Sequence, residues 1–76
     1  MPTVHREHGM SFVVYTDDHP PPHVHVTDRG TAKITLTPIV GMLGVRGMSK
    51  ADTARALAVV KSHRDMMLDA WDRIHG

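Results

Sequence analysis

Residues 23–37 have the sequence HVHVTDRGTAKITLT, in which apolar and polar side chains alternate on both sides of Asp28-Arg29-Gly30. Alternation of this kind is typical of half-buried β-strands, because successive side chains point to opposite faces of a sheet. A three-residue loop with glycine in a left-handed conformation commonly closes such a hairpin. The apolar residues share one face when Val24 pairs with Ile34. The stretch therefore predicts an antiparallel hairpin whose histidines lie on the polar face.

The flanking segments extend the predicted sheet. Met10–Thr16 is rich in β-branched and aromatic residues and predicts a strand, whereas residues 3–8 are a weaker candidate for an edge strand. Asp17–Pro22 contains three consecutive prolines, which lack amide donors, so we expect a stiff, irregular link there. Pro38–Met48 is rich in glycine yet apolar, and predicts either a short fifth strand or a covering loop.

A single long helix is predicted from about Lys50 to Ile74. Ser49, followed three residues later by Asp52, has the pattern of a capping box at the start of a helix. Apolar residues then recur at helical spacing and should pack on the sheet, namely Leu57, Val60, Met67, Leu68, Trp71 and Ile74. We therefore expect one α+β domain over residues 1–76, with a small antiparallel sheet of three to five strands packed against one long C-terminal helix.

Seven histidines are the outlier in a composition of 76 residues with a formal net charge of +1. This charge is not the strongly basic balance of a dedicated DNA-binding protein. No apolar run reaches the ~20 residues of a membrane span, and Met1–Gly9 lacks the apolar stretch of a signal peptide. The absence of cysteine is compatible with the cytosol. We expect a cytoplasmic protein without membrane attachment, and the small core and apolar segment 38–48 favour a homodimer.

The histidines at positions 19, 23 and 25 flank and follow the proline link. His23 and His25 are two residues apart on a predicted strand, so their side chains project from the same face. His19, held near them by the prolines, supplies a third imidazole. Three histidines with an open position are typical of catalytic zinc, and an added carboxylate from Asp17 or Asp18 also suits manganese or iron. The sequence thus predicts a divalent metal site with His19, His23 and His25 as ligands.

The same residues permit two other interpretations. Lys33, expected opposite His25, would disfavour the protonated imidazole. A histidine pair beside a lysine is equipped for metal-free acid–base cleavage of a phosphodiester, which makes His23, His25 and Lys33 candidate catalytic residues. Histidines beside prolines can also merely stack, cap a turn or bind a backbone carbonyl. The spacing alone leaves all three interpretations open.

Three basic residues are candidate contacts to phosphate or nucleic acid: Lys33, Arg64 and Arg46. Arg64 falls within the apolar stripe of the predicted helix, from which it can reach phosphate or the aspartates of the proline link. The alternative is an arginine that buries its stem and keeps its guanidinium in water. Arg46 precedes the helix N-terminus, where free amides favour anions, although an ordinary solvated loop is the simpler explanation.

The chain resembles the family described as domain of unknown function 4160. The resemblance rests on Met1-Pro2-Thr3, on the strand ending at Tyr15, and on Asp18-His-Pro-Pro-Pro-His-Val-His25. The helical residues also resemble that family, in Ala54-Arg-Ala-Leu57, His63-Arg-Asp65, Leu68 and Ala70-Trp71. The resemblance implies that the motif positions of the family are His19, His23 and His25 in this chain, together with Asp18, His63, Arg64 and Trp71. The sequence departs from the family at Gly41–Met48, where the family is more polar.

The resemblance implies a small bacterial α+β module of the cytosol, associated with toxin–antitoxin-like gene pairs. It favours, first, a binding module for nucleic acid or for a paired small protein that acts through the histidine-rich turn. A metal-dependent hydrolase, either a phosphoesterase or a nuclease with a three-histidine site, is the alternative. A metal-free ribonuclease and a purely structural or protein-interaction module are the remaining hypotheses.

Overall fold

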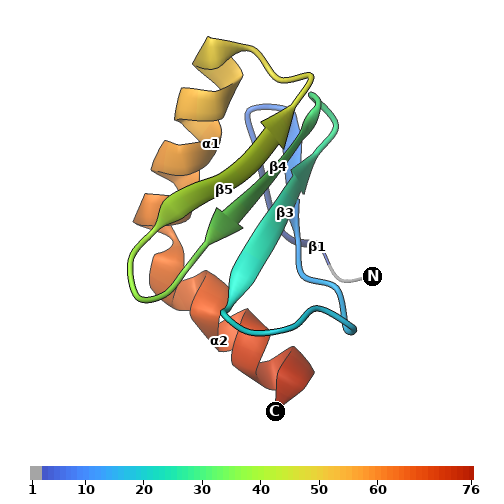
Figure 1. Cartoon of the computed structure of the whole chain (residues 1–76), viewed down its shortest axis with the longest axis vertical. Helices are drawn as coiled ribbons and strands as arrows, with labels where there is room; N and C mark the ends of the chain where they lie inside the picture. Colours follow the sequence, from blue (N-terminus) through green and yellow to red (C-terminus); the bar gives the residue numbers. More distant parts are fainter. Residues whose placement is uncertain (1–2) are drawn as a thin grey trace.

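The computed structural model describes residues 3–76 and consists of one antiparallel sheet and two helices (Figure 1). The five strands are neighbours in sequence order, so the sheet is a meander, β1-β2-β3-β4-β5. The elements are β1 (Thr3–Glu7), β2 (Met10–Val13), β3 (His23–Thr27), β4 (Thr31–Thr35), β5 (Gly41–Arg46), α1 (Lys50–Ser62) and α2 (Arg64–His75). The α+β class and the antiparallel sheet are confirmed, at the upper end of the predicted number of strands.

The hairpin of β3 and β4 has the predicted register. Val24 pairs with Ile34, and His25 pairs with Lys33. Gly30 in the connecting loop has a φ of +106°, which glycine adopts without steric cost. Asp28 also has a positive φ, of +82°, which the sequence did not indicate. The alternation of side chains therefore determines which residues face the core.

The core lies between one face of the sheet and the two helices. In the sheet, its largest fully buried side chains include Phe12, Val24, Val26 and Ile34. The helices contribute further apolar side chains to the core. The buried apolar residues of the helices are Ala56, Val59, Val60, Met67 and Trp71. These residues are buried because the apolar face of the sheet packs against the apolar stripe of each helix.

The prediction of one long C-terminal helix is wrong, because the helix is broken at His63. The backbone of this residue has a φ of −112° and a ψ of 20°, outside the helical range, and it ends α1 and begins α2. Two tertiary contacts accompany the break: the His63 ring packs on His5 at 4.2 Å between centroids, and Arg64 Nε donates to the Leu36 carbonyl oxygen over 2.7 Å. Figure 1 shows the resulting change of direction between α1 and α2.

The start of the helical region is where the sequence places it. The Ser49 hydroxyl accepts a hydrogen bond from the Asp52 amide over 3.1 Å, which is one half of the predicted capping box. The Asp52 carboxylate forms an ion pair with Arg55 instead of completing the box. An acidic residue in the first turn also interacts favourably with the helix dipole.

The glycine-rich segment forms the fifth strand at one edge of the sheet. Its pairing with β4 is irregular between Lys33 and Ile34. Three large apolar side chains of the segment are exposed, Ile39, Leu43 and Val45. The homodimer stays a prediction, and these side chains are the surface it would use. No helix within residues 3–76 is long and apolar enough to cross a membrane.

The two glycines Gly30 and Gly44 provide a matched test of the hairpin. A Cβ at Gly30 would lie 2.5 Å from the Gly47 carbonyl oxygen, whereas one at Gly44 would meet nothing within 4 Å. We expect Gly30→Ala to lower the free energy of unfolding by at least about 1 kcal/mol, and the melting temperature by roughly 4–8 °C for each kcal/mol. Gly44→Ala should stay within about 0.5 kcal/mol of wild type. Equal effects of the two substitutions in urea unfolding would contradict the loop geometry.

Candidate metal centre

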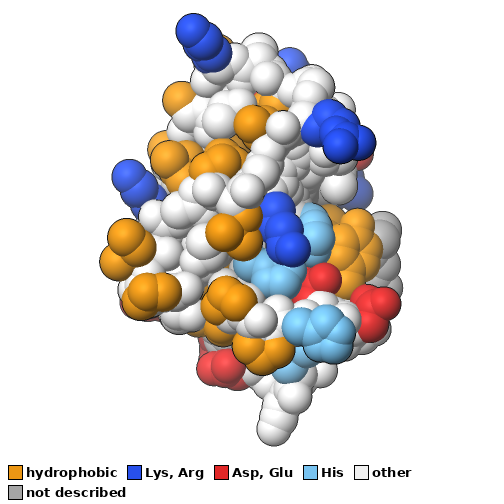
Figure 2. All heavy atoms as spheres, in the orientation of Figure 1, with side chains coloured by type: hydrophobic (Ala, Val, Ile, Leu, Met, Phe, Trp, Pro, Cys, Tyr) orange, Lys and Arg blue, Asp and Glu red, His pale blue; other side chains and the backbone are white. Residues whose placement is uncertain are grey.

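The candidate site lies at the start of β3, where His23 packs against Trp71 of α2 and His25 is partly exposed. The pleat turns His25 away from the core residue Val24, and the preceding loop brings Asp18 alongside it. In Figure 2 histidine side chains gather with carboxylates and a basic side chain in the lower half of the visible face. Asp18, His23 and His25 form a group whose nitrogen and oxygen donors all lie within 4.8 Å of one another.

Asp18 is held in place by the turn that follows β2. Its carboxylate accepts a hydrogen bond from the Tyr15 amide over 3.1 Å, while its own amide donates to the Tyr15 carbonyl oxygen over 3.2 Å. Both carboxylate oxygens lie 3.2 Å from His25 Nε2. Burial raises the pKa of Asp18, but the Tyr15 amide and His25 together outweigh it, so the net pKa is lowered. Asp18 is therefore ionised at neutral pH.

His23 is nearly inaccessible, with 3% of its surface exposed. Its Nδ1 lies 2.8 Å from the Pro21 carbonyl oxygen, which can only accept a hydrogen bond, so the neutral ring carries its proton on Nδ1. The other nitrogen, Nε2, then presents a lone pair. This atom is buried without a hydrogen-bond partner among the residues described, and the nearest carboxylate oxygen, on Asp18, is 3.5 Å away.

Aromatic rings hold the two imidazoles from both sides. Trp71 of α2 packs against His23 with 5.2 Å between ring centroids, and Tyr15 meets the His25 ring edge-on at 4.7 Å. The His23 and His25 rings are 5.1 Å apart. His75 also stacks on Trp71, with 3.8 Å between ring centroids. Trp71 is the core anchor that the helical stripe predicted, and it also supports a residue of the site.

The donor atoms have the separations expected of ligands that share an ion. At metal–ligand distances of about 2.0–2.2 Å, two ligands of a tetrahedral zinc ion are about 3.3–3.5 Å apart. The two Asp18–imidazole distances given above, 3.2 and 3.5 Å, lie close to this separation. Two imidazole nitrogens and one carboxylate also form the three-ligand set of non-haem iron sites. The residues present thus fit a divalent transition metal with open coordination positions.

A pocket of about 250 Å³ adjoins the site. Lys33, which pairs with His25 across the hairpin, is exposed and lines this pocket. The remaining lining residues come from the proline link, from the start of β3 and from β5, namely Asp17, Asp18, His19, Pro20, Pro21, His23 and Leu43. An anionic ligand in this pocket would lie beside both the ammonium group of Lys33 and the candidate metal position.

The structure brings together only part of the predicted site. His23, His25 and Lys33 are neighbours, as the hairpin register requires. His19 is exposed on the pocket wall and lies outside the ligand group, where Asp18 supplies the third donor among residues 3–76. The sequence indicated Asp18 only as a residue that orients or completes the coordination. The metal-ligand role of His19 stays a prediction.

The three basic residues predicted to contact phosphate lie in different places. Lys33 faces the pocket, and Arg64 donates to the backbone at the end of β4 while lying 3.7 Å from Asp65. Arg46 is opposite Thr31, at the far end of the β4–β5 pair from Thr35 and Gly41. Among residues 3–76, only Lys33 of these three lies at the histidine site.

The sequence did not predict a second group of donors, which consists of His5, Glu7 and His63. The available signal was the alternation of His5 and Glu7 on β1, which places them on one face. Their approach to His63 depends on the break between the helices, which local sequence does not indicate.

Comparison with known proteins places the chain in a family. The family model described as domain of unknown function (DUF4160) matches residues 9–72, and the chain therefore belongs to this family. The match covers the first donor group and His63, whereas His5 and Glu7 lie outside it. No curated protein and no solved structure matches the chain.

Because Nε2 of His23 has no partner, the two histidines should respond differently to substitution in metal-free protein. His23→Leu conserves apolar volume and removes an orphaned atom that costs about 1–3 kcal/mol, at the loss of one hydrogen bond worth about 1 kcal/mol. We expect this variant to be at least as stable as wild type in urea unfolding with a chelator present. His25→Leu removes a nitrogen that is already hydrogen-bonded, and should lose about 1 kcal/mol. The opposite order would show that His23 Nε2 is satisfied.

Proposed function

We propose that the protein is a divalent-metal-dependent hydrolase of phosphate esters, with Asp18, His23 and His25 as the metal ligands. The observation that carries the proposal is the buried, unpartnered Nε2 of His23, which lies 3.5 Å from the carboxylate of Asp18. Buried polar atoms nearly always have a partner, and an ion is one of the few species that can supply it here.

The environment of His23 supports a metal ligand more than a general base. Metal-binding histidines usually donate their other ring N–H to a carbonyl or carboxylate, which fixes the tautomer and the ring orientation. Pro21 supplies that carbonyl, and Trp71 packs against the ring. The ionised carboxylate of Asp18 adds negative charge, so zinc, manganese and iron all match the donor set.

The pocket beside the site supports a phosphate ester as the substrate. A bound metal ion of this kind would polarise the phosphoryl group and generate a nucleophilic water at neutral pH. Lys33 would bind the phosphoryl oxygens through its ammonium group, because it lines the same pocket as His23 and Asp18.

Nucleic acid is a specific form of this substrate class. Since Lys33 is the one predicted phosphate contact that lies at the site, the pocket suits a single phosphate group rather than a long duplex surface. A protein that contacts few phosphates shows only a shallow dependence of affinity on salt. Binding of a paired small protein, as in a toxin–antitoxin-like pair, stays a prediction from the family resemblance.

Metal binding is the first test of the proposal. Tag-free protein, freed of metal by chelation and titrated with Zn²⁺ and Mn²⁺, should bind an ion whose affinity falls by at least about 100-fold in His25→Ala and Asp18→Asn. Asp17→Asn, at the neighbouring and exposed carboxylate, is the matched control and should change the affinity less than threefold.

His19→Ala tests whether the third imidazole is a ligand. We expect it to retain the metal, because His19 lies outside the donor group of residues 3–76. A loss as large as that of His25→Ala would restore the three-histidine site predicted from the sequence. Affinities that are equal in wild type, His25→Ala and Asp18→Asn would exclude a metal at this position.

Activity is the second test. Metal-loaded protein should hydrolyse bis(p-nitrophenyl) phosphate or p-nitrophenyl phosphate, the diester and monoester probes, and lose turnover in His25→Ala. Lys33→Ala should reduce kcat/KM by roughly 10- to 100-fold through loss of one charged contact to phosphate, whereas the exposed Lys61→Ala should not. Cleavage of RNA that resists chelator and disappears in His25→Ala would favour the metal-free ribonuclease instead. No turnover of either probe or of RNA and DNA oligonucleotides would overturn the hydrolase.

A further inference from the structure

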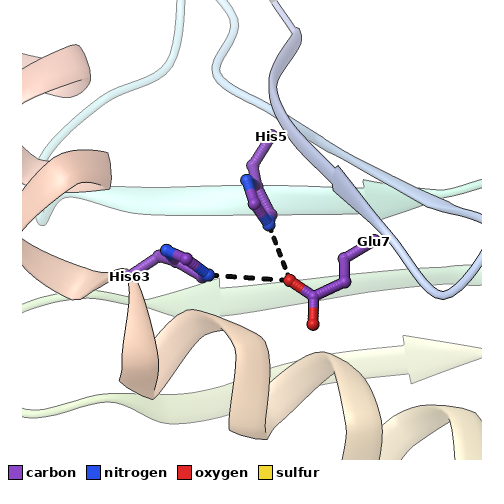
Figure 3. A group of neighbouring side chains, drawn as sticks. All are labelled: His5, Glu7 and His63. Atoms are coloured by element: carbon purple, nitrogen blue, oxygen red, sulfur yellow. Dashed lines mark hydrogen bonds and ion pairs between the residues drawn. The ribbon is translucent and has the colours of Figure 1, made fainter.

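A second histidine cluster lies where the first strand meets the junction of the helices. It consists of His5 and Glu7 on β1 and of His63 between α1 and α2, as Figure 3 shows. Because His5 and His63 are 58 positions apart in the sequence, 63 minus 5, only the tertiary fold brings them together. Nothing in the proposed function uses these side chains.

Both imidazoles point to the same oxygen atom. His5 Nε2 lies 2.9 Å from Glu7 Oε1, and His63 Nε2 lies 3.6 Å from that atom (Figure 3). The two rings pack at 4.2 Å between centroids with 37° between their planes. All three donor atoms lie within 4.8 Å of one another. They are therefore near enough for small side-chain movements to bring them around one transition-metal ion.

Hydrogen bonding accounts for the contact between His5 and Glu7, but not for the approach of His63. The distance from His63 Nε2 to the carboxylate is too long for a hydrogen bond, so this nitrogen approaches Oε1 without bonding to it. Two protonated imidazoles would repel one another at the observed ring separation. His8 Nε2, 3.4 Å from the other oxygen of Glu7, adds a further imidazole to the same carboxylate.

The carboxylate is ready to bind a cation. Like an ordinary glutamate side chain, Glu7 carries an ionised carboxylate at neutral pH. His5, Glu7 and His63 keep 21, 42 and 38% of their side-chain surfaces exposed, so an ion can enter from solvent and retain water ligands.

We propose that His5, Glu7 and His63 form a second site for a divalent transition metal, which links β1 to the α1–α2 junction. Two imidazoles and one carboxylate select borderline ions such as Zn²⁺, Ni²⁺ and Cu²⁺ over Mg²⁺ and Ca²⁺. Since the ligands converge only in the folded chain, the ion stabilises the native state. His5 and Glu7 lie outside the family match, so this site is not implied by membership of the family.

The test uses full-length, tag-free protein in a His25→Ala background, where the first site is disabled. Titration with Zn²⁺ or Ni²⁺ should still detect one bound ion. At 100 times the dissociation constant, the melting temperature should rise by roughly 10 °C or more above that in chelator. His63→Ala and Glu7→Gln should each abolish this rise, and Mg²⁺ should not produce it.

His75→Ala and Asp69→Asn are the matched controls, because both replace exposed helical residues away from the cluster. They should leave the metal-dependent rise unchanged. Melting in chelator shows whether each variant still folds, and Glu7→Gln keeps the side-chain shape if His63→Ala does not fold. A rise that persists in His63→Ala or Glu7→Gln, or no rise at all, would overturn the second site. Wild-type stoichiometry separates the two proposals, since the His25 and His63 substitutions should each remove a different ion.

Discussion

The pairing of Val24 with Ile34 in the β3–β4 hairpin is the constraint on which the rest of the structure depends. Both side chains are fully buried against the helices, so their burial fixes the register of the sheet. A slip of one residue would turn His25 into the core and Val24 into solvent, because side chains of a strand alternate. The same pairing therefore builds the core and places His25 opposite the exposed Lys33, next to the buried His23 and the pocket.

Local patterns predicted the parts of the molecule that depend on local geometry. The hairpin register, the loop with Gly30 and the start of α1 at Ser49 all follow from residues that are neighbours in sequence. The break at His63 was missed for a physical reason: Val60 and Met67 are seven residues apart, which is two helical turns, so their stripe has the same phase in a straight or a bent helix. Contacts with His5 and Leu36 accompany the bend, and both lie far away in the sequence.

The candidate site was predicted in the same partial way. His23 and His25 belong to a strand, so their relative direction follows from the pleat. Asp18 and His19 belong to an irregular link, and the direction of an irregular link is set by hydrogen bonds that sequence does not show. The reciprocal bonds between Asp18 and Tyr15 turn the carboxylate towards His25. Residue type and spacing thus located the site, but could not choose between an aspartate and a histidine as the third donor.

The two proposed metal sites differ in burial, and burial decides how strongly water competes for their donors. His23 Nε2 is out of contact with solvent, so in metal-free protein no water compensates for its missing partner, and an ion that binds there recovers the cost. His5, Glu7 and His63 are partly exposed and hydrated, so an ion must displace water from every donor. Trp71 and the Pro21 carbonyl also fix the His23 ring before an ion arrives, which lowers the entropy lost on binding. We therefore expect the buried site to fill first and the exposed site to exchange its ion more readily.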